Sequence, residues 1–456
     1  MDARSVMEYG ALSARHVGEL IDPGHAGYDE ARRVWNGMID RRPALIARCG
    51  GVDDVVAAIG FARERDLAIA IRGGGHSAAG LAVGDDALVI DLGAMNTVSV
   101  DPTAAVARAG GGAKWGQFDV ATTAHGLATT GGAISTTGIG GLTLGGGLGY
   151  LMRSHGLSCD NLRGAEVVTA DGNLVRTSAS ERPELLWGLR GGGGNFGVVT
   201  SLEYDLHPLP NSMVTAGMVV HPADRARKML HFFRATCASA PDDLTVFAAL
   251  LSSPDGMPIA AMLPCYSGPP AEAERVVGPL RDFGPPIGGD VGPMPYTALQ
   301  SMLDEGFPGG LQVYWTGHFL SGLPDDAIET ALDAFGRIPS PLSAILFEQL
   351  GGAMSRVGRD DTAFDHREAA FNLAIISRWT TPEQAEASIA WTRAFSAAMK
   401  PFARGAYVNY LGVGDATDRV RAAYGDAKYA RLAALKAQYD PGNRFRLNQN
   451  IAPAAT

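Results

Sequence analysis

Cysteine is scarce in this chain, and long apolar runs are missing. The four cysteines stand far apart and form no C-x-x-C pair, a spacing that predicts neither a zinc site nor a disulfide framework. We therefore expect free thiols buried in a cytoplasmic protein. No stretch of about 20 apolar residues is present, so no membrane partner or membrane span is expected. The first residues, MDARSVMEYG, lack the apolar region of a signal peptide.

Basic clusters are also missing. The chain has 38 Lys and Arg against 48 Asp and Glu, which gives a net charge of −10. An acidic surface repels phosphate backbones, so no nucleic-acid partner is expected. The motifs G-x-x-x-x-G-K-[ST], H-E-x-x-H and G-x-S-x-G do not occur, so the signatures of P-loop NTPases, zinc proteases and α/β-hydrolases are absent. No metal site is predicted.

The length of 456 residues predicts two domains. Segment 43–100 alternates strand-like and helix-like patterns, and segment 104–205 is rich in glycine and strands. The pattern changes near Pro208-Leu-Pro210, which marks a domain boundary. From 213 to about 400, strands and helices alternate, which predicts one sheet covered by helices on one face. The strands expected there lie at 213–221, 244–252, 257–264, 311–320, 343–350 and 371–379, and the helices at 223–238, 271–283, 325–337 and 382–399.

Glycine is abundant, with 59 residues, and it is concentrated in loops. Two glycine-rich loops, at 72–80 and 131–149, lie next to predicted strands. Closely spaced glycines let backbone N–H groups approach an anion, so these loops predict a pyrophosphate site. Gly192-Gly-Gly-Asn-Phe-Gly197 matches the G-x-G-x-x-G fingerprint of dinucleotide-binding folds. That fingerprint needs a strand before it and a helix after it, and here the order is reversed, so we reject the match.

His76 follows three glycines inside the first loop. A lone histidine is most often structural, but its place in an anion-binding loop favours contact with a ligand. Arg72-Gly-Gly-Gly-His-Ser77 resembles the R-x-G-G-H motif of the vanillyl-alcohol-oxidase/PCMH-type flavoproteins, and in particular their berberine-bridge-enzyme-like branch. Further similar segments, in matching order, are Thr137 to Gly147, His155 to Asn161, Leu186 to Val199 and Tyr439 to Arg446.

The resemblance implies an α+β protein with a PCMH-type FAD-binding domain at 1–207 and a substrate domain at 208–405, whose antiparallel sheet is covered by helices. Segment 406–456 is expected to return to the FAD-binding domain. In this family the loop histidine is bonded to the 8α carbon of the flavin, which here implies His76. The other residues expected to bind FAD are Arg72, Gly73, Gly74, Gly75, Ser77, Gly80, Gly131, Thr136, Thr137, Gly138, Gly140, Gly141, Gly146, Gly149, Asn161, Val199, Asn409, Asn448 and Asn450.

Some relatives carry a second bond to the flavin from a cysteine four residues before the first glycine of G-x-G-G. Ile134 occupies that position here, and Cys159 falls in a later motif. A single attachment through His76 is therefore expected. The relatives with two bonds also have a histidine directly after G-x-G-G, where this chain has Leu142.

Tyr407-Val-Asn-Tyr410 resembles the Y-x-N-Y motif of the branch, which implies that Tyr410 is the catalytic base and that Tyr407 and Asn409 lie beside it. Oxidation of an alcohol or amine requires loss of the O–H or N–H proton, and a base with a lowered pKa can accept it. On a regular strand Tyr407 and Tyr410 would face opposite sides, so both tyrosines can share one pocket only if the strand ends there. Gly412 replaces an aspartate of the family motif.

The substrate is expected to lie between the flavin and the sheet of the second domain. Candidate residues on that sheet are Trp315, His318, Glu348, Gln349, Asn372 and Arg378. The resemblance implies oxidation of a small alcohol, sugar or N-heterocycle, with O₂ reaching the flavin past Thr137 and leaving as H₂O₂. A tailoring dehydrogenase or oxidocyclase remains an alternative, as does a flavin-binding protein without turnover, since Leu142 and Gly412 depart from the motifs. The oligomeric state is left open, with a homodimer as one candidate.

Overall fold

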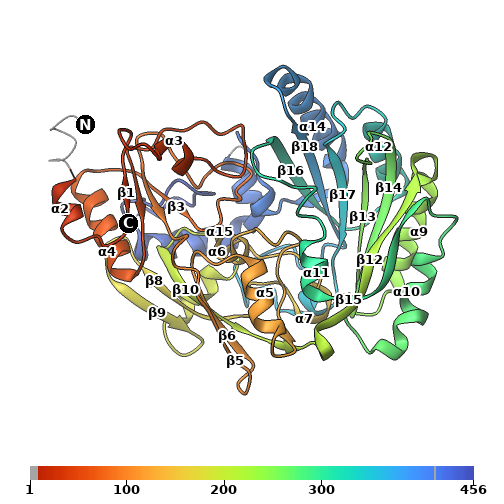
Figure 1. Ribbon diagram of the computed structural model, residues 1–456, viewed down its shortest axis with the longest axis horizontal. Helices are drawn as coiled ribbons and strands as arrows, with labels where there is room; N and C mark the ends of the chain where they lie inside the picture. Colours follow the sequence, from red (N-terminus) through yellow and green to blue (C-terminus); the bar gives the residue numbers. More distant parts are fainter. Residues whose placement is uncertain (1–8, 415–416, 456) are drawn as a thin grey trace.

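The protein has two lobes that lie side by side in the computed structural model, which describes residues 9–414 and 417–455 (Figure 1). The first lobe contains the N-terminal half of the chain and most of its last 50 residues. The second lobe contains the eight-stranded sheet built from residues 213–405. The two lobes meet along the glycine-rich segments, so the fold itself brings those segments next to the second lobe.

A four-stranded sheet at one end of the first lobe carries the first glycine loop. Its order is β1-β2-β4-β3, and β4 runs parallel to both β2 and β3. Helix α4 connects β2 to β3, which lie on either side of β4 and both run parallel to it. The glycine loop leaves the end of β3. The bounds are Leu20–Ile21 for β1, Leu45–Arg48 for β2, Val52–Glu64 for α4, Ile69–Arg72 for β3 and Leu88–Asp91 for β4.

A five-stranded antiparallel sheet forms the rest of the first lobe, in the order β5-β6-β10-β8-β9. Its core contains Trp115, Phe118 and Tyr204, whose rings pack edge to face. The strands are β5 Val98–Asp101, β6 Val106–Gly110, β8 Leu162–Val168, β9 Leu174–Ser178 and β10 Val198–Asp205. The neighbouring helices are α5 Trp115–Thr123, α6 Ile139–Leu144 and α8 Pro183–Leu189.

The second lobe is an eight-stranded antiparallel sheet in the order β15-β12-β14-β13-β17-β18-β16-β19. The strands are β12 Met213–Pro222, β13 Leu244–Ser252, β14 Pro258–Tyr266, β15 Gly288–Pro295, β16 Gln312–Leu320, β17 Ala344–Gln349, β18 Phe371–Trp379 and β19 Ala403–Gly405. Four helices cover the outer face: α9 Ala226–Ser239, α10 Ala273–Arg281, α12 Asp325–Phe335 and α14 Ala385–Met399 (Figure 1).

The two faces of this sheet belong to different cores. Phe347 and Phe371 pack with the helices, whereas Phe247 and Phe319 pack with Tyr407 on the side of the first lobe. Side chains alternate between the faces of a strand, so neighbouring residues of one strand serve opposite cores. This alternation decides which of the predicted site residues can reach the first lobe.

Several short elements and one long C-terminal helix complete the fold. They are α2 Gly10–Ser13, α3 Tyr28–Ala31, β7 Leu127–Ala128, α7 Met152–His155, β11 His207–Pro208, α11 Tyr296–Ser301, α13 Ala353–Arg356 and α15 Thr417–Tyr439. The 3-10 turns are η1 Pro210–Ser212, η2 Ala223–Arg225, η3 Pro270–Glu272, η4 Pro382–Gln384, η5 Lys400–Phe402 and η6 Val408–Tyr410. The sequence patterns did not predict α6, α11, β15 or β19, because glycine, proline or short length masks their periodicity.

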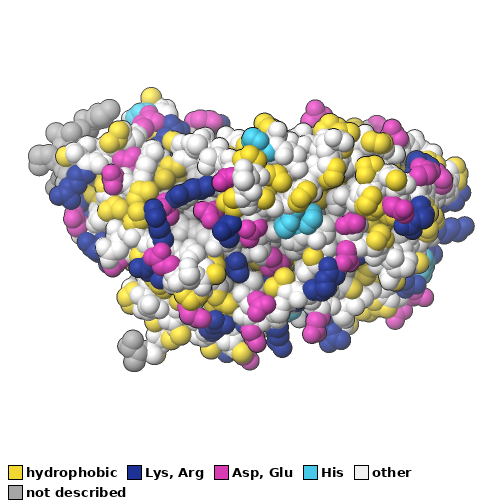
Figure 2. All heavy atoms as spheres, turned by 90° about the horizontal axis from the view of Figure 1, so that it is seen from below, with side chains coloured by type: hydrophobic (Ala, Val, Ile, Leu, Met, Phe, Trp, Pro, Cys, Tyr) yellow, Lys and Arg dark blue, Asp and Glu magenta, His cyan; other side chains and the backbone are white. Residues whose placement is uncertain are grey.

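Acidic and basic side chains are interspersed on the face shown in Figure 2, without a large patch of one sign. In the described part of the chain no helix combines the length and the apolar character that a membrane crossing requires. Over the same residues, no three or more His, Cys, Asp or Glu side chains gather as metal ligands would. The four cysteines are free thiols.

Candidate active site

The two glycine-rich loops pack backbone against backbone. A Cβ atom on Gly74 would lie 2.4 Å from the nitrogen of Gly138, and one on Gly138 would lie 2.4 Å from the nitrogen of Gly74. A Cβ on Gly73 would lie 3.0 Å from the carbonyl oxygen of Gly111, which is a tight contact. Real Cβ atoms essentially never approach within 3.0 Å, so glycine is required at Gly74 and Gly138 for the two loops to meet. Gly141, in contrast, is exposed and has no atom within 4 Å of a Cβ position.

His76 lies where the two loops meet. Its Nε2 atom is 2.9 Å from the hydroxyl of Thr136 in the second loop. Its ring is stacked on the indole of Trp35, with centroids 5.1 Å apart and planes 19° apart. Burial, and then the charge of Lys114, lower the pKa of His76 to about 4. The imidazole is therefore neutral near pH 7, with a lone pair available for bonding.

Arg72 braces the first loop from inside the protein. Its guanidinium donates to the carbonyl oxygen of Ala31 and, at 2.8 Å, to the carboxylate of Asp91. The side chain is 8% exposed, so its charge is directed into the protein and not toward a pyrophosphate. Gly75 and Gly80 have φ values of +70° and +69°, which explains glycine at these two turns. The Ser77 hydroxyl accepts a hydrogen bond from the N–H of Leu81 at 3.4 Å.

Several predicted cofactor residues serve close packing within the protein. A Cβ on Gly149 would lie 1.6 Å from the oxygen of Gly131, and one on Gly146 would lie 2.6 Å from the ring of Phe364. Asn161 uses its whole amide on protein partners: its Nδ2 donates to His155 and Leu157 oxygens, and its Oδ1 contacts His207. A Cβ on Gly111 would lie 2.2 Å from the oxygen of Val199, and a Cβ on Gly140 would lie 3.4 Å from the oxygen of Gly111. The oxygen of Thr137 accepts a hydrogen bond from the N–H of Trp115 at 3.0 Å.

Two asparagines near the C-terminus present unpartnered acceptors. The Oδ1 atoms of Asn448 and Asn450 are buried and have no hydrogen-bond partner within the described chain. The Asn448 amide nitrogen donates to the oxygens of Gly194 and Phe445, which fixes the orientation of the side chain. A buried amide oxygen without a partner is costly. These two atoms are therefore available to hydroxyl or N–H groups of a ligand.

Tyr407 and Tyr410 share one site because η6 replaces the strand at this point. The 3-10 turn over 408–410 brings their rings to 4.9 Å between centroids. The Tyr407 hydroxyl accepts from the N–H of Gly147 at 2.9 Å and from the Nδ2 of Asn409 at 2.9 Å. Asn409 also donates to the oxygen of Leu142 at 3.0 Å. The motif thus joins the C-terminal segment to the second glycine loop.

Glu348 is the partner of Tyr410. The Tyr410 hydroxyl donates to Oε1 of Glu348 at 3.0 Å, and Asn372 donates to Oε2. Burial raises the pKa of Glu348 to about 7, although both hydrogen bonds oppose this effect. Burial and the adjacent carboxylate raise the pKa of Tyr410 well above its usual value. A base with a lowered pKa was expected at Tyr410, and the structure shows the opposite direction.

The six candidates on the sheet do not face the same way. Trp315 packs against Tyr410 with centroids 4.8 Å apart, and Glu348 and Asn372 are paired opposite each other on β17 and β18. His318 instead contacts the Ser396 hydroxyl of α14 at 2.8 Å, and Gln349 binds the N–H of Val246 and the oxygen of Cys237. Both point to the helical face. Arg378 donates to the oxygens of Gly306 and Leu342 and lies over the ring of Phe307.

The departures from the family motifs have structural counterparts. A Cβ on Gly412 would lie 2.1 Å from the oxygen of Trp315, so an aspartate cannot occupy this position without moving the backbone. The side chain of Leu142 packs on Gly132, and a Cβ added to Gly132 would lie 3.3 Å from the methyl groups of Leu142. Cys159 is fully buried, and burial raises the pKa of its thiol far above the usual value.

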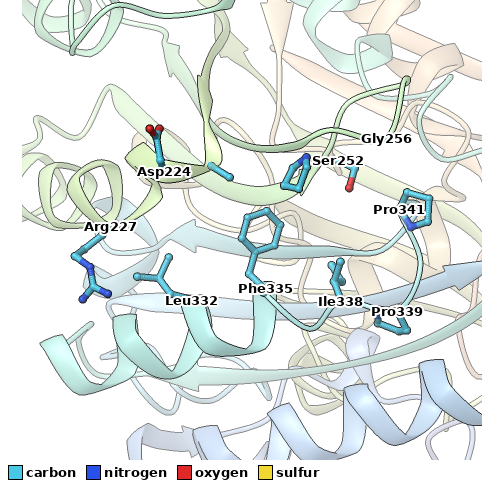
Figure 3. Close-up of a pocket in the computed structure, with 12 residues that line it drawn as sticks. Asp224, Arg227, Ser252, Gly256, Leu332, Phe335, Ile338, Pro339 and Pro341 are labelled. Carbon is cyan, nitrogen blue, oxygen red and sulfur yellow. The ribbon is translucent and has the colours of Figure 1, made fainter.

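A separate hollow of about 780 Å³ opens on the helical side of the second lobe (Figure 3). It is bounded by the start of α9, the turn between β13 and β14, and the end of α12, with Asp224, Arg227 and Phe335 among the lining side chains. None of the residues predicted for cofactor binding or catalysis lines it. Trp35 stacks on His76 and lies 6.5 Å from Trp315, whose ring is 4.8 Å from that of Tyr410, so we place the candidate active site between the lobes, where these residues lie.

Two segments of the chain that contribute to this candidate site match known protein families. Residues 43–178, which include the first glycine loop and His76, match a family model described as FAD binding domain. Residues 406–452, which include Tyr407 and Tyr410, match a model described as Berberine and berberine like. An FAD-linked oxidoreductase of Dictyostelium discoideum is 32% identical over 423 residues, 92% of this chain and 91% of that protein.

The chain belongs to the berberine-bridge-enzyme-like family of FAD-linked oxidoreductases. Its FAD-linked relatives include the (R)-6-hydroxynicotine oxidase of Paenarthrobacter nicotinovorans, 31% identical over 448 residues, 96% of this chain and 97% of that protein. The crystal structure of 6-hydroxy-D-nicotine oxidase from Arthrobacter nicotinovorans superposes with a TM-score of 0.88 at 29% identity, covering 96% of this chain and 98% of that one.

A solved structure with lower sequence identity to this chain has the same fold. BBE-like 1 of Physcomitrella patens has a TM-score of 0.88 at 21% identity, covering 98% of this chain and 99% of that chain. The expected α+β architecture, with a PCMH-type FAD-binding lobe and an antiparallel sheet covered by helices, is therefore correct. As in other members of this family, the enzyme is an FAD-dependent oxidoreductase.

Trp35 and Asn36 are the site neighbours that the sequence analysis missed. They precede His76 by 41 and 40 residues and lie outside every glycine loop. Trp35 stacks on the His76 ring, and Asn36 is fully buried between the lobes. The sequence around them carries neither periodicity nor a glycine pattern, so no local signal could have found them.

Proposed function

We propose that this enzyme oxidises a small alcohol, sugar or N-heterocyclic amine with an FAD bonded covalently to His76 alone, and that the electrons pass to O₂ to give H₂O₂. The observation that carries the proposal is the position of a neutral His76 imidazole between two glycine loops, across the site from the Tyr410–Glu348 pair. When bound, FAD supplies the two-electron acceptor for a hydride from the substrate.

The residues present fit FAD. The backbones of Gly73, Gly74 and Gly141 offer N–H groups with no side chain in the way. The orphaned Oδ1 atoms of Asn448 and Asn450 supply acceptors for N–H or hydroxyl groups. Gly138 and Thr136 belong to the second loop, and Asn409 donates to the oxygen of Leu142 in the same loop. The single attachment is supported by the full burial of Cys159 and by Ile134 at the linking position.

The bond to His76 balances without a further cofactor. His76 would supply the ring nitrogen and give up its N–H proton, and one hydrogen would leave the 8-methyl carbon of FAD as the C–N bond forms. The two electrons and two protons released would pass to O₂ and give H₂O₂. A protonated imidazole has no lone pair for this bond, so the low pKa of His76 favours the reaction near neutral pH.

We assign the proton transfer to Tyr410 and Glu348 together. The raised pKa of Tyr410 means that the phenol is protonated near pH 7 and cannot act as a base alone. It can accept the substrate proton as it passes its own to Glu348, which lies 3.0 Å away. Asn372 holds the other oxygen of the carboxylate, and Tyr407 fixes the turn on which Tyr410 lies.

The test is a purified sample that is denatured in acid and then examined for bound flavin by intact mass and by fluorescence of the protein band. Wild type and Cys159→Ala should retain the flavin, and His76→Ala should lose it. Peroxide release should then be measured with alcohols, sugars and cyclic amines. Flavin that is retained in His76→Ala would contradict the attachment. Substrate-dependent reduction without H₂O₂ would favour the tailoring dehydrogenase, and no reduction by any substrate class would favour a protein without turnover.

A further inference from the structure

Residues 35–37 connect the His76 loop to the second lobe through their backbone. The N–H of Trp35 donates to the oxygen of Gly75 at 3.1 Å, and the oxygen of Trp35 accepts from Gly310 at 2.9 Å. The N–H of Gly37 donates to the oxygen of Leu311 at 2.8 Å. The segment therefore bonds to the residue next to His76 on one side and to the loop that leads into β16 on the other.

The Asn36 side chain makes the same connection again. Its Nδ2 donates to the oxygen of Ala78 at 2.6 Å and to the oxygen of Val313 at 2.9 Å. Its Oδ1 accepts from the N–H of Val313 at 3.0 Å. Asn36 is 0% exposed, and hydrogen bonds between buried groups are costly to leave unmade. One amide thus joins the first glycine loop directly to β16.

The Trp35 indole lies on the imidazole of His76 and is held from the opposite lobe. Its Nε1 donates to the oxygen of Phe307 at 3.1 Å, and its ring is 6.5 Å from that of Trp315. The stacked face restricts rotation of the His76 ring, and Thr136 contacts the ring edge at Nε2. The orientation of the imidazole therefore depends on how the second lobe is docked.

We propose that residues 35–37 form a clasp that positions the His76 imidazole for its bond to FAD, with Trp35 as the positioning residue. The inference rests on the attachment proposed above. Bond formation requires the ring nitrogen and the flavin carbon to be held close and aligned, and loss of alignment slows such steps by large factors. Because the clasp is held by β16 and the loop before it, attachment is fast only when the two lobes are correctly packed.

Replacements at Trp35 separate stacking from simple packing. Trp35→Leu fills much of the space but removes both the flat ring and the N–H donor, whereas Trp35→Phe keeps a ring that can stack on His76. Trp391→Leu is the matched control, because that half-buried indole also donates to a backbone oxygen, of Ala334 at 2.8 Å, but lies on α14. Asn36→Ala removes the second connection.

Apoprotein of each variant is mixed with FAD under air. Total bound FAD is measured after desalting, and covalently bound flavin is measured over time after denaturation. We expect Trp35→Leu and Asn36→Ala to bind FAD but to attach it about tenfold or more slowly. Trp35→Phe should stay within about threefold of wild type, and Trp391→Leu should match wild type. The clasp is refuted if Trp35→Leu with bound FAD attaches it at the wild-type rate, or if Trp391→Leu slows attachment equally.

The pH dependence of attachment gives a second readout that a purely structural role would not change. Lys114 and Asp304 are the charged groups that act on His76, the first lowering and the second raising its pKa, and burial has the largest effect. Removing the indole admits water, so the pKa of His76 should rise toward its ordinary value. Attachment in Trp35→Leu should then slow further between about pH 8 and about pH 5, while wild type changes little.

The two proposals fail in different ways. Wild-type protein without any covalent flavin would refute attachment through His76, and with it the role of the clasp. Wild-type protein with covalent flavin, together with a normal rate and pH profile in both Trp35→Leu and Asn36→Ala, would refute the clasp alone. If Trp35→Leu does not fold, the comparison of Asn36→Ala with Trp35→Phe still decides the question.

Discussion

In the proposed mechanism, the hydrogen bond from the Tyr410 hydroxyl to Glu348 provides the route by which a proton leaves the substrate. Glu348 is 3% exposed, and the pKa of its carboxyl group is raised to about 7 because burial disfavours the charged form. The Tyr410 phenol beside Glu348 does not become more acidic, because burial and the negative charge of the carboxylate both raise the pKa of Tyr410. We therefore propose that the pair acts as a relay that ends on the carboxylate.

The relay predicts how activity depends on pH. Glu348 must be ionised to receive a proton, so kcat/KM should rise with pH through about 7, the pKa of its carboxyl group. Glu348→Gln should lower kcat/KM by about 10²–10⁴-fold and flatten this rise, and Tyr410→Phe should give a loss of similar size. Stopped-flow reduction of the enzyme with an oxidisable substrate over a pH series is the measurement. Glu368→Gln, at an exposed site, is the control. An unchanged pH profile in Glu348→Gln would exclude this carboxylate.

At the scale of elements, the cofactor loops depend on contact between two backbones. Gly74 and Gly138 approach so closely that neither can carry a side chain in place. The second loop is also held by the second lobe, because the carboxylate of Asp304 accepts from the N–H and hydroxyl of Ser135. The conformation of both loops is thus a property of the packed elements around them.

Gly74→Ala should open this contact. Its Cβ would lie 2.4 Å from the nitrogen of Gly138, so one loop must move, at a cost of about 1–3 kcal/mol in the free energy of unfolding. The fraction of FAD that stays with the protein on gel filtration should fall. Gly60→Ala is the matched control, since Gly60 lies inside α4 with no atom within 4 Å of its Cβ position. That variant should be as stable as wild type or more so by up to about 1 kcal/mol. Equal FAD retention in both variants would contradict a role of the Gly74–Gly138 contact in FAD binding.

At the scale of the whole molecule, the chain returns to the first lobe after it has built the second. Lys436 and Asp440, at the end of α15, form a fully buried ion pair with a 2.6 Å separation. Lys436 also donates to the oxygens of Asn195 and Phe445, and the side-chain oxygen of Asn195 accepts from Ile451 N–H. These bonds agree with the proposed division in which 406–456 belongs with 1–207.

Asp440→Ala should therefore destabilise the protein strongly. It leaves the Lys436 ammonium buried without a counter-charge, and breaking such a pair costs about 3–5 kcal/mol. Burial already lowers the pKa of Lys436, so the lysine should lose its proton more readily in the variant. Glu184→Ala is the control, because it removes the 2.6 Å ion pair with Arg431, whose side chains are 63% and 39% exposed. That change should cost less than about 1 kcal/mol in denaturant unfolding. Equal losses of unfolding free energy in the two variants would contradict the prediction that burial makes the Lys436–Asp440 pair the more important one.

Local patterns were sufficient for much of the fold. The alternating strands and helices after Pro208 are present nearly where they were expected, because apolar periodicity and turn residues act over a few residues. The motifs around His76 and Tyr410 also led to the correct family. Shorter elements were missed: β15 and β19 at the sheet edges have weak periodicity, and α6 is hidden among glycines.

The sequence by itself determined the family, the FAD cofactor and the two glycine loops, because each of these depends on residues close together in the chain. Only the tertiary structure decided which side chains face the site. Glu348 and Gln349 are neighbours in sequence, yet the pleat of β17 directs one toward Tyr410 and the other toward α9. The turn η6 brings both tyrosines together, and packing between the lobes places Trp35 on His76. Such contacts join residues far apart in the chain, so no local pattern encodes them.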